Sequence, residues 1–391
     1  MIAADQRRPV HVVYGGAHLF KADLCRKLGD LALRSLSTYA PDASALAEIT
    51  GIPGDLAHAV YPRVVDKLRT EPIEDYRIDF EDGYGFRPDA EEDAHATAAA
   101  EETRKAMAGG QLPPFFGIRI KPLEEPLAPR ALRTLRIYLQ TVATLPERFV
   151  VTLPKIAAPE QVCTLLDALP SEASLELMVE TPRAVLNLPQ LVDAAAGRAV
   201  AAHFGPYDYM SSLGITAAHQ KLTHPACDFA RSIIQLRLAG TGLGLSDGPC
   251  TTLPIAPHRG DSLNSDQRSE NAAVMRRAWK LHYDHVRRAL EHGYYQSWDL
   301  HPAQLVTRYA AVYAFFHEGL REASARLRNF VGQAAQATRI GDVFDDAATA
   351  QGLRNHFLRA LRCGAIAEAD VPALTGLSAE QLRSATIFHG K

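Results

Sequence analysis

Short apolar runs alternate with longer helical patterns along most of this chain, and this alternation limits the folds open to it. Eight runs read as strands, at residues 10–15, 76–81, 115–120, 149–154, 175–180, 200–205, 241–247 and 295–300. Helical spacing of apolar residues fills most of the gaps, at residues 21–38, 89–108, 126–143, 158–168, 183–196, 226–239 and 266–291. Strands that alternate with helices pair in parallel, because each helix returns the chain to the same edge of the sheet.

Eight strand–helix units predict an α/β fold, a closed TIM (β/α)8 barrel, for which about 250 residues are typical. The competing fold is an open doubly wound sheet, which would need fewer strands or a glycine-rich dinucleotide turn. The GTGLG segment at 240–244 does not fit that turn. No further strand pattern follows the last run. We therefore expect residues 1–305 to form the barrel and residues 306–391 an entirely helical extension.

Composition limits the partners of the chain. A formal net charge of −3 gives no reason to expect nucleic acid or an anionic membrane, because both usually need a basic face. No stretch of about 18 uncharged apolar residues occurs, so we expect no membrane span. The five cysteines are odd in number and lack paired spacing, which is typical of reduced thiols. We expect a cytoplasmic protein.

Two acidic residues, Glu180 and Asp208, stand just past two consecutive predicted strands. The active site of a TIM barrel lies at the carboxyl ends of its strands. Two carboxylates placed there can hold a hard dication such as Mg²⁺ or Mn²⁺, which takes oxygen ligands. The alternative is that Glu180 caps the helix after Thr181 and Pro182 and that Asp208 is a loop or N-cap residue.

Other polar residues end the remaining strands. Arg119 suits bidentate capture of a carboxylate, or alternatively a salt bridge to a neighbouring strand. Glu81 and Asp82, in RIDFEDG, read as groups that support metal-bound water or act in acid–base work, or as a solvated turn. Lys155 could balance these carboxylates, with a Schiff base as the less favoured role. Asp299 is a further candidate contact for substrate and a candidate base.

In order along the chain, these segments resemble the HpcH/HpaI aldolase and citrate lyase β-subunit family of phosphoenolpyruvate/pyruvate-binding barrels. The matching elements are DFEDGY (79–84), IRIK (118–121), PK (154–155), VETPRAVLN (179–187), FGPYDYMSSLGI (204–215), DGP (247–249) and LHPAQ (300–304). The family's N-terminal R-S-x-L-F-x-P element is replaced here by HVVYGGAHLF, in which His18 is a candidate substitute. The chain therefore looks like a divergent member.

The resemblance implies that Glu180 and Asp208 bind Mg²⁺, that Arg119 holds a substrate carboxylate, and that Glu81 and Asp82 orient water or substrate. Further substrate contacts are expected from Lys155 and Asp299, and from Gly205 and Pro206 in the FGPYD segment.

The function expected is Mg²⁺-dependent carbon–carbon bond cleavage or formation by a homo-oligomeric lyase. Its substrate would be a keto acid or an acyl thioester, carried on coenzyme A or on an acyl carrier. Positive charge beside the enolate oxygen would stabilise the fragment left by bond cleavage. Two alternatives remain: a non-catalytic or regulatory protein on the same scaffold, and an enzyme that uses phosphoenolpyruvate.

Overall fold

A computed structural model describes residues 7–260, 262–332, 338–340, 343–345 and 347–384. Its centre is a closed barrel of parallel strands in chain order, with β8 pairing back onto β1. The strands are β1 (His11–Gly16), β2 (Asp75–Asp79), β3 (Phe115–Arg119), β4 (Phe149–Leu153), β5 (Ser174–Val179), β6 (Ala199–Phe204), β7 (Gly244–Asp247) and β8 (Gln296–Trp298). Each overlaps one of the eight predicted strands. The predicted TIM barrel is confirmed, and the doubly wound alternative is excluded.

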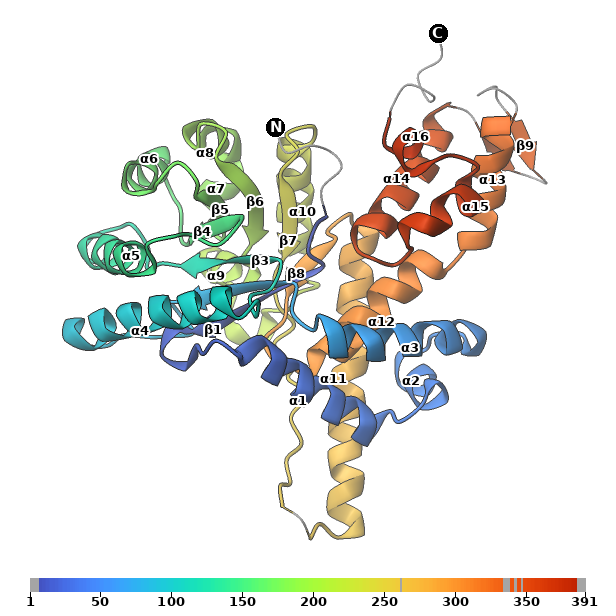
Figure 1. Ribbon diagram of the computed structural model, residues 1–391, viewed down its shortest axis with the longest axis horizontal. Coiled ribbons are helices and arrows are strands. Elements are labelled where there is room, and N and C mark those ends of the chain that lie inside the picture. The colour runs from blue at the N-terminus through green and yellow to red at the C-terminus, as the bar shows by residue number, and fades with distance from the viewer. Residues whose placement is uncertain (1–6, 261, 333–337, 341–342, 346, 385–391) are drawn as a thin grey trace.

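Helices cover the outside of the barrel, as Figure 1 shows. Those before β7 are α1 (Leu24–Tyr39), α2 (Ala43–Thr50), α3 (Gly54–Thr70), α4 (Asp89–Ala108), α5 (Ala128–Val142), α6 (Pro159–Ala168), α7 (Pro182–Leu186), α8 (Leu188–Ala194), α9 (Pro206–Ser212) and α10 (Pro225–Leu238). After β7 come α11 (Ser265–Glu291) and α12 (Gln304–His317). Their apolar faces pack on the outward side chains of the strands in one continuous core. None of the helices in the described ranges combines the length and apolarity that crossing a membrane requires.

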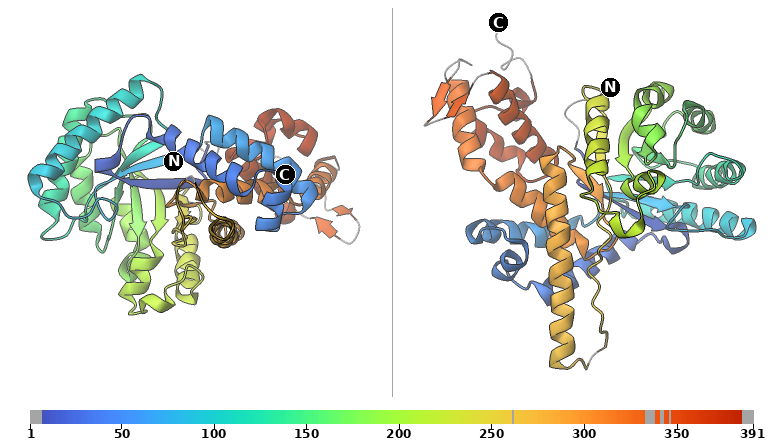
Figure 2. Two further views of the ribbon diagram at one scale, coloured as in Figure 1. Left: turned by 90° about the horizontal axis from the view of Figure 1, so that it is seen from below. Right: turned by 180° about the vertical axis from the view of Figure 1, so that it is seen from behind.

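The longest helix, α11, runs out beyond the rest of the molecule together with the loop before it (Figure 1, and the right view of Figure 2). The loop is fastened to the helix by His258 and Asn271. The His258 N–H donates to Asn271 Oδ1 at 2.9 Å, and Asn271 Nδ2 donates to the His258 carbonyl at 3.0 Å. Helix and loop therefore form one projecting arm.

The C-terminal part of the chain is mostly helical, as predicted. It contains α13 (Leu320–Gly332), α14 (Ala347–Arg362), α15 (Val371–Thr375) and α16 (Ala379–Arg383). The prediction of an entirely helical segment was wrong in one place, because β9 (Thr338–Ile340) and β10 (Val343–Asp345) pair in an antiparallel sheet. Helix α12 is buried along nearly its whole length, next to α3 and α11. A division of the chain at residue 305 remains a proposal.

Candidate active site

Four carboxylates gather around Lys155 at the carboxyl ends of the strands, three of them near its ammonium group and Glu180 at its backbone N–H. Glu81 and Asp82 follow β2, Glu180 follows β5, and Asp208 lies in the first turn of α9, after β6. Lys155, after β4, stands between them: its Nζ is paired with Glu81 Oε1 and lies 3.5 Å from Asp82 Oδ1 and 4.0 Å from Asp208 Oδ2. The fold therefore brings together residues that are up to 127 positions apart (81 to 208), as expected for residues at the ends of barrel strands.

Glu180 is the most deeply buried member of this acidic cluster, with Glu81 next. Its Oε1 accepts a hydrogen bond of 2.5 Å from the backbone N–H of Lys155, whose φ of 48° lies in the left-handed region. Burial, and then the nearby Asp208 carboxylate, raise the pKa of Glu180 to about 8. The cap of α7 is the Thr181 hydroxyl, which accepts from the Ala184 N–H, so Glu180 is free of the capping role that was the alternative.

Lys155 stays charged in this setting. Burial alone would lower the pKa of its ammonium group, but the carboxylates of Glu81 and Glu180 outweigh that effect and raise it. Burial also raises the pKa of Glu81, although Arg119 and Lys155 oppose the rise. The raised pKa of Lys155 disfavours the free amine that Schiff-base formation requires, so its acidic neighbours do not favour that alternative role.

The acidic cluster fits a hard dication. Glu81, Asp82, Glu180 and Asp208 offer only oxygen ligands, and Lys155 offsets part of their charge. Within the described ranges, no three His, Cys, Asp or Glu side chains are already arranged as a complete metal site. Mg²⁺ is commonly held by one or two carboxylates together with waters and substrate oxygens, so Glu180 and Asp208 stay the predicted protein ligands.

Gly205 leaves the space that Glu180 occupies. A Cβ at this position would stand 2.5 Å from the Glu180 Cβ and 2.6 Å from its Oε2. We expect Gly205→Ala to displace the Glu180 carboxylate and to lower the affinity for Mg²⁺ about tenfold or more, measured by isothermal titration calorimetry. Gly54→Ala, where a Cβ would meet nothing within 4 Å, is the matched control. Equal affinities in the two variants would contradict the assignment of Glu180.

Arg119 forms the floor of the site. Its Nε and Nη2 donate to the two oxygens of Asp79, at 2.7 and 2.6 Å, and its Nη1 lies 3.1 Å from Glu81 Oε2. The guanidinium lies 4.9 Å from the ring centre of Tyr14 and 5.3 Å from that of Trp298. Arg119 thus forms the salt bridge to a neighbouring strand that was the alternative to substrate binding, with Asp79 as its partner. Contact with a substrate carboxylate, through Nη1, stays a prediction.

Asp299 does not face the mouth of the barrel. Alternation along β8 points Trp298 inward and Asp299 outward, between the barrel and the helices. Its Oδ2 lies 3.1 Å from His11 Nδ1 and its Oδ1 lies 2.9 Å from His282 Nε2, while Arg308 donates to both oxygens. The carboxylate is fully buried. We therefore correct the predicted roles of Asp299 in substrate binding and as a base: it fastens α11 and α12 to the barrel.

We expect Asp299→Asn to lower the free energy of unfolding by about 3–5 kcal/mol, because it leaves the buried Arg308 without its anion. Burial alone would raise the pKa of Asp299, but Arg308 and the two histidines hold it well below its ordinary value. Stabilisation by this group is therefore complete above its unfolded pKa of about 3.9 and is lost as pH falls toward the folded value. Urea unfolding of the wild type and of Asp299→Asn between pH 7 and pH 3 tests the size of this loss and its dependence on pH. A difference in the free energy of unfolding that stays constant over this range would contradict the pH dependence.

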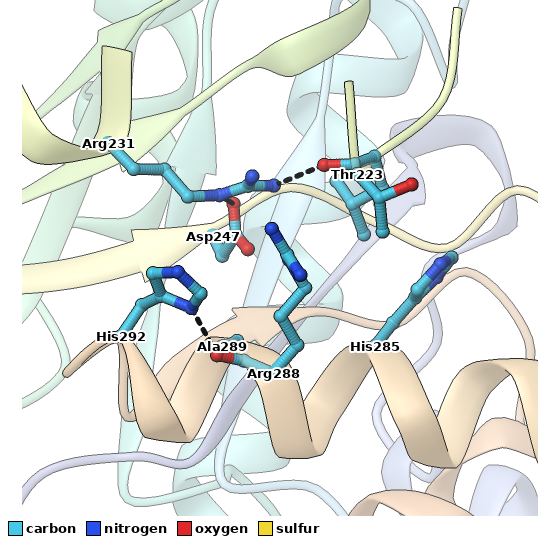
Figure 3. A pocket seen from close by; sticks show the side chains of 8 residues that line it. Thr223, Arg231, Asp247, His285, Arg288, Ala289 and His292 are labelled. Carbon is cyan, nitrogen blue, oxygen red and sulfur yellow. Dashed lines mark hydrogen bonds and ion pairs between the residues drawn. The ribbon is translucent and has the colours of Figure 1, made fainter. Parts of the chain in front are cut away.

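Asp247, from the DGP segment, also lies outside the barrel interior. It accepts from Arg231 Nε at 3.0 Å and from the Gly248 N–H at 2.9 Å. Figure 3 shows it beside Arg231, above His285 and Arg288 of α11. The cavity between them holds about 10 Å³, which is room for roughly one water molecule and not for a substrate.

Sequence reasoning missed the polar interior of the barrel. Tyr14 donates to Glu176 Oε1 at 2.7 Å, Thr152 donates to the same oxygen at 2.7 Å, and Arg77 pairs with Asp75. TIM barrels usually fill this space with branched apolar side chains. The available signal was a polar residue at alternate positions of an otherwise apolar strand, as with Glu176 in LELMVE and His203 in VAAHFG.

The barrel and its extension give the chain the fold of a citrate lyase and of the protein CitE. A citrate lyase from Burkholderia xenovorans LB400 superposes with a TM-score of 0.62 at 19% sequence identity, over 94% of this chain and 96% of that one. CitE from Mycobacterium tuberculosis, in complex with magnesium, acetoacetate and coenzyme A, gives a TM-score of 0.54 at 16% identity, over 92% and 98%. At these identities the likeness establishes the fold.

In sequence, the chain belongs to the family DUF6986, described as a domain of unknown function, which it matches over residues 3–389. The match covers the barrel and the C-terminal helices together. No curated protein matches the chain.

Proposed function

We propose that this chain is a Mg²⁺-dependent carbon–carbon lyase or aldolase, a divergent relative of the HpcH/HpaI and citrate lyase β-subunit enzymes. One observation carries the proposal: Glu81, Asp82 and Asp208 lie around the Lys155 ammonium and Glu180 accepts from the Lys155 N–H, at the end of the barrel where TIM-barrel enzymes have their active sites. The magnesium, acetoacetate and coenzyme A bound by the M. tuberculosis protein support a keto acid or an acyl thioester as substrate.

In this proposal, Glu180 and Asp208 hold the dication, which when bound supplies Lewis-acid stabilisation of an enolate worth several kcal/mol. Arg119 provides a second fixed positive charge, held in place by Asp79 and by the rings of Tyr14 and Trp298.

Several neighbouring groups complete the proposed site. Lys155 keeps Glu81 oriented, and Gly205 and Pro206 let the substrate approach the backbone at the start of α9. Asp82, whose side chain is 60% exposed, is the proposed base because it is the carboxylate most open to a ligand.

The reaction is tested by incubating the protein with Mg²⁺ and a panel of keto acids and acyl-coenzyme A thioesters. Release of pyruvate, oxaloacetate or glyoxylate is followed with coupled dehydrogenases, and chelated samples serve as the control. We expect release that depends on Mg²⁺. Keto-acid binding without any turnover would instead support a non-catalytic role, and consumption of phosphoenolpyruvate would support the other alternative.

We also propose a homo-oligomer in the cytoplasm with small-molecule partners only. Light scattering of the purified chain measures its mass in solution and so tests whether it is a homo-oligomer. A mass equal to the single chain of 42.7 kDa would overturn it.

A further inference from the structure

A larger cavity lies at the opposite end of the barrel from the candidate active site. It holds about 510 Å³ and is bounded by α3 and α12 on one side and by the C-terminal helices α14 and α16 on the other (Figure 1). Arg7, in its wall, precedes β1, and Glu74, which pairs with Arg7, immediately precedes β2. The strands are parallel, so both residues mark the amino edge of the barrel, whereas the acidic cluster lies at the carboxyl edge.

The volume of this cavity suits an organic molecule. Pockets for small molecules usually hold about 300–1,000 Å³, whereas a single water takes about 30 Å³. Part of the wall is apolar, because Leu358 and Leu361 of α14 and the ring of Tyr313 of α12 line it. These side chains favour a ligand with an apolar or aromatic body.

The rest of the wall is mostly basic. Two of its side chains are acidic, Asp66 and Glu368, and five are basic, namely Arg7, Arg63, Lys67, Arg362 and Arg383. The basic side chains come from the segment before β1 and from α3, α14 and α16, so they reach the cavity from several directions. A tetrahedral phosphate group, with a charge of about −1.5 to −2 at pH 7, accepts hydrogen bonds from several directions.

Carboxylates anchor two of these cations at the barrel. Arg7 Nη1 donates to Glu71 Oε2 at 2.8 Å, and Lys67 Nζ lies 2.5 Å from Glu71 Oε1 and 2.6 Å from Glu74 Oε1. Glu74 is fully buried, so it can fix the position of both cations.

Arg63 lacks such an anchor. Its Nη1 donates to the carbonyl of Ala365 at 3.1 Å, and no carboxylate within the described ranges pairs with it. Arg63 is exposed and lies on α3, while Ala365 follows α14, so the guanidinium spans the two sides of the cavity. Its other N–H groups are therefore open to an acceptor held between α3 and α14.

Two more arginines extend the positive charge beside the cavity. Arg8 donates to the carbonyl of Gly242 at 2.5 Å, and Arg359 lies 4.5 Å from the ring centre of Tyr295. Burial, and then the nearby Arg359, lower the pKa of Arg8. Neither arginine has a carboxylate partner in the part of the chain that the structure describes. Seven basic side chains thus stand around or beside the cavity, against the carboxylates of Asp66, Glu71, Glu74 and Glu368.

We propose that this cavity binds a phosphorylated small molecule of nucleotide size. Arg63 and Arg362 would hold the phosphate group, and Tyr313, Leu358 and Leu361 would contact the apolar or aromatic body. A ligand that contacts α3 and α14 together joins the C-terminal helices to the barrel. The proposal is independent of the proposed function, because it concerns the other end of the barrel.

Matched pairs of ligands test this site by isothermal titration calorimetry of the full chain. The probes are adenosine monophosphate against adenosine, and flavin mononucleotide against riboflavin. A chelator is present, so that no dication at the acidic cluster can bind the phosphate. We expect at least one phosphorylated probe to bind about tenfold or more tightly than its parent, since only that member can pair with the arginines.

Variants locate the bound phosphate. Arg63→Gln and Arg362→Gln should each lower the affinity for that probe about tenfold, because each removes one positive charge from the cavity wall. Arg69→Gln is the matched control, since Arg69 is exposed on the same helix as Arg63 but does not line the cavity. Circular dichroism shows that each variant is folded.

The outcomes are decisive for the cavity. A loss of affinity in at least one of the two cavity variants, with wild-type affinity in Arg69→Gln, supports the proposal. Binding of neither phosphorylated probe, or equal binding of both members in each pair, overturns it. Wild-type affinity in both cavity variants, or an equal loss in Arg69→Gln, also overturns it, because the phosphate would then bind elsewhere or only through general charge.

Discussion

Glu180→Gln should abolish tight Mg²⁺ binding, with a loss of about 100-fold or more in affinity, and should leave the fold intact. The amide keeps the size of the side chain but removes the charge that a hard dication requires. Because Glu180 is buried and Asp208 stands nearby, its charge is a burden on the folded state, as its raised pKa indicates. The variant should therefore melt at the wild-type temperature or above it.

Titration calorimetry with Mg²⁺, or with Mn²⁺ as a spectroscopic substitute, gives the affinity, and circular dichroism gives the melting temperature. Glu92→Gln is the matched control, since Glu92 is equally buried but pairs with Lys121 on the outside of the barrel. Unchanged affinity in Glu180→Gln and in Asp208→Asn would remove the central assignment.

Replacing Arg119 should cost stability and binding together. Arg119→Met leaves Asp79 buried without its two-point partner, and we expect a loss of about 3–5 kcal/mol in the free energy of unfolding. Arg119→Lys should cost less stability but should weaken keto-acid binding severely, because a point charge cannot reproduce the planar fork.

A double-mutant cycle that combines Arg119→Met with Asp79→Asn measures the interaction free energy between the two side chains. Burial alone would raise the pKa of Asp79, but Arg119 outweighs that effect and lowers it, so the two residues should be strongly coupled. Strictly additive losses in urea unfolding would contradict the coupling. Keto-acid affinity close to wild type in Arg119→Lys would contradict the substrate contact, without affecting the salt bridge.

Apolar periodicity was enough to predict the barrel, because each strand is short, apolar and bounded by turn residues. Apolar periodicity did not predict α2 and α3, for which no helix was expected. Helix α3 contains Pro62, ordinarily a signal against a helix interior, and it forms because its apolar face packs against α12. Likewise, the predicted helix at 183–196 is two helices, α7 and α8, which meet at Asn187.

The site could be predicted only in part, for a geometrical reason. Polar residues at strand ends lie at the correct edge of the barrel. This criterion correctly selected Glu81, Lys155 and Glu180, which the structure places next to one another. It cannot tell which face of the strand a residue occupies, since one position along the strand reverses the direction of the side chain. That is why Trp298 was overlooked and Asp299, its neighbour, was chosen.

The ammonium of Lys155 amid its acidic neighbours has a practical consequence for handling this protein. Lys155 is an internal counter-ion for these carboxylates, so we expect the chain to fold without a bound cation. Adding or chelating Mg²⁺ should then leave the melting temperature of the chain nearly unchanged.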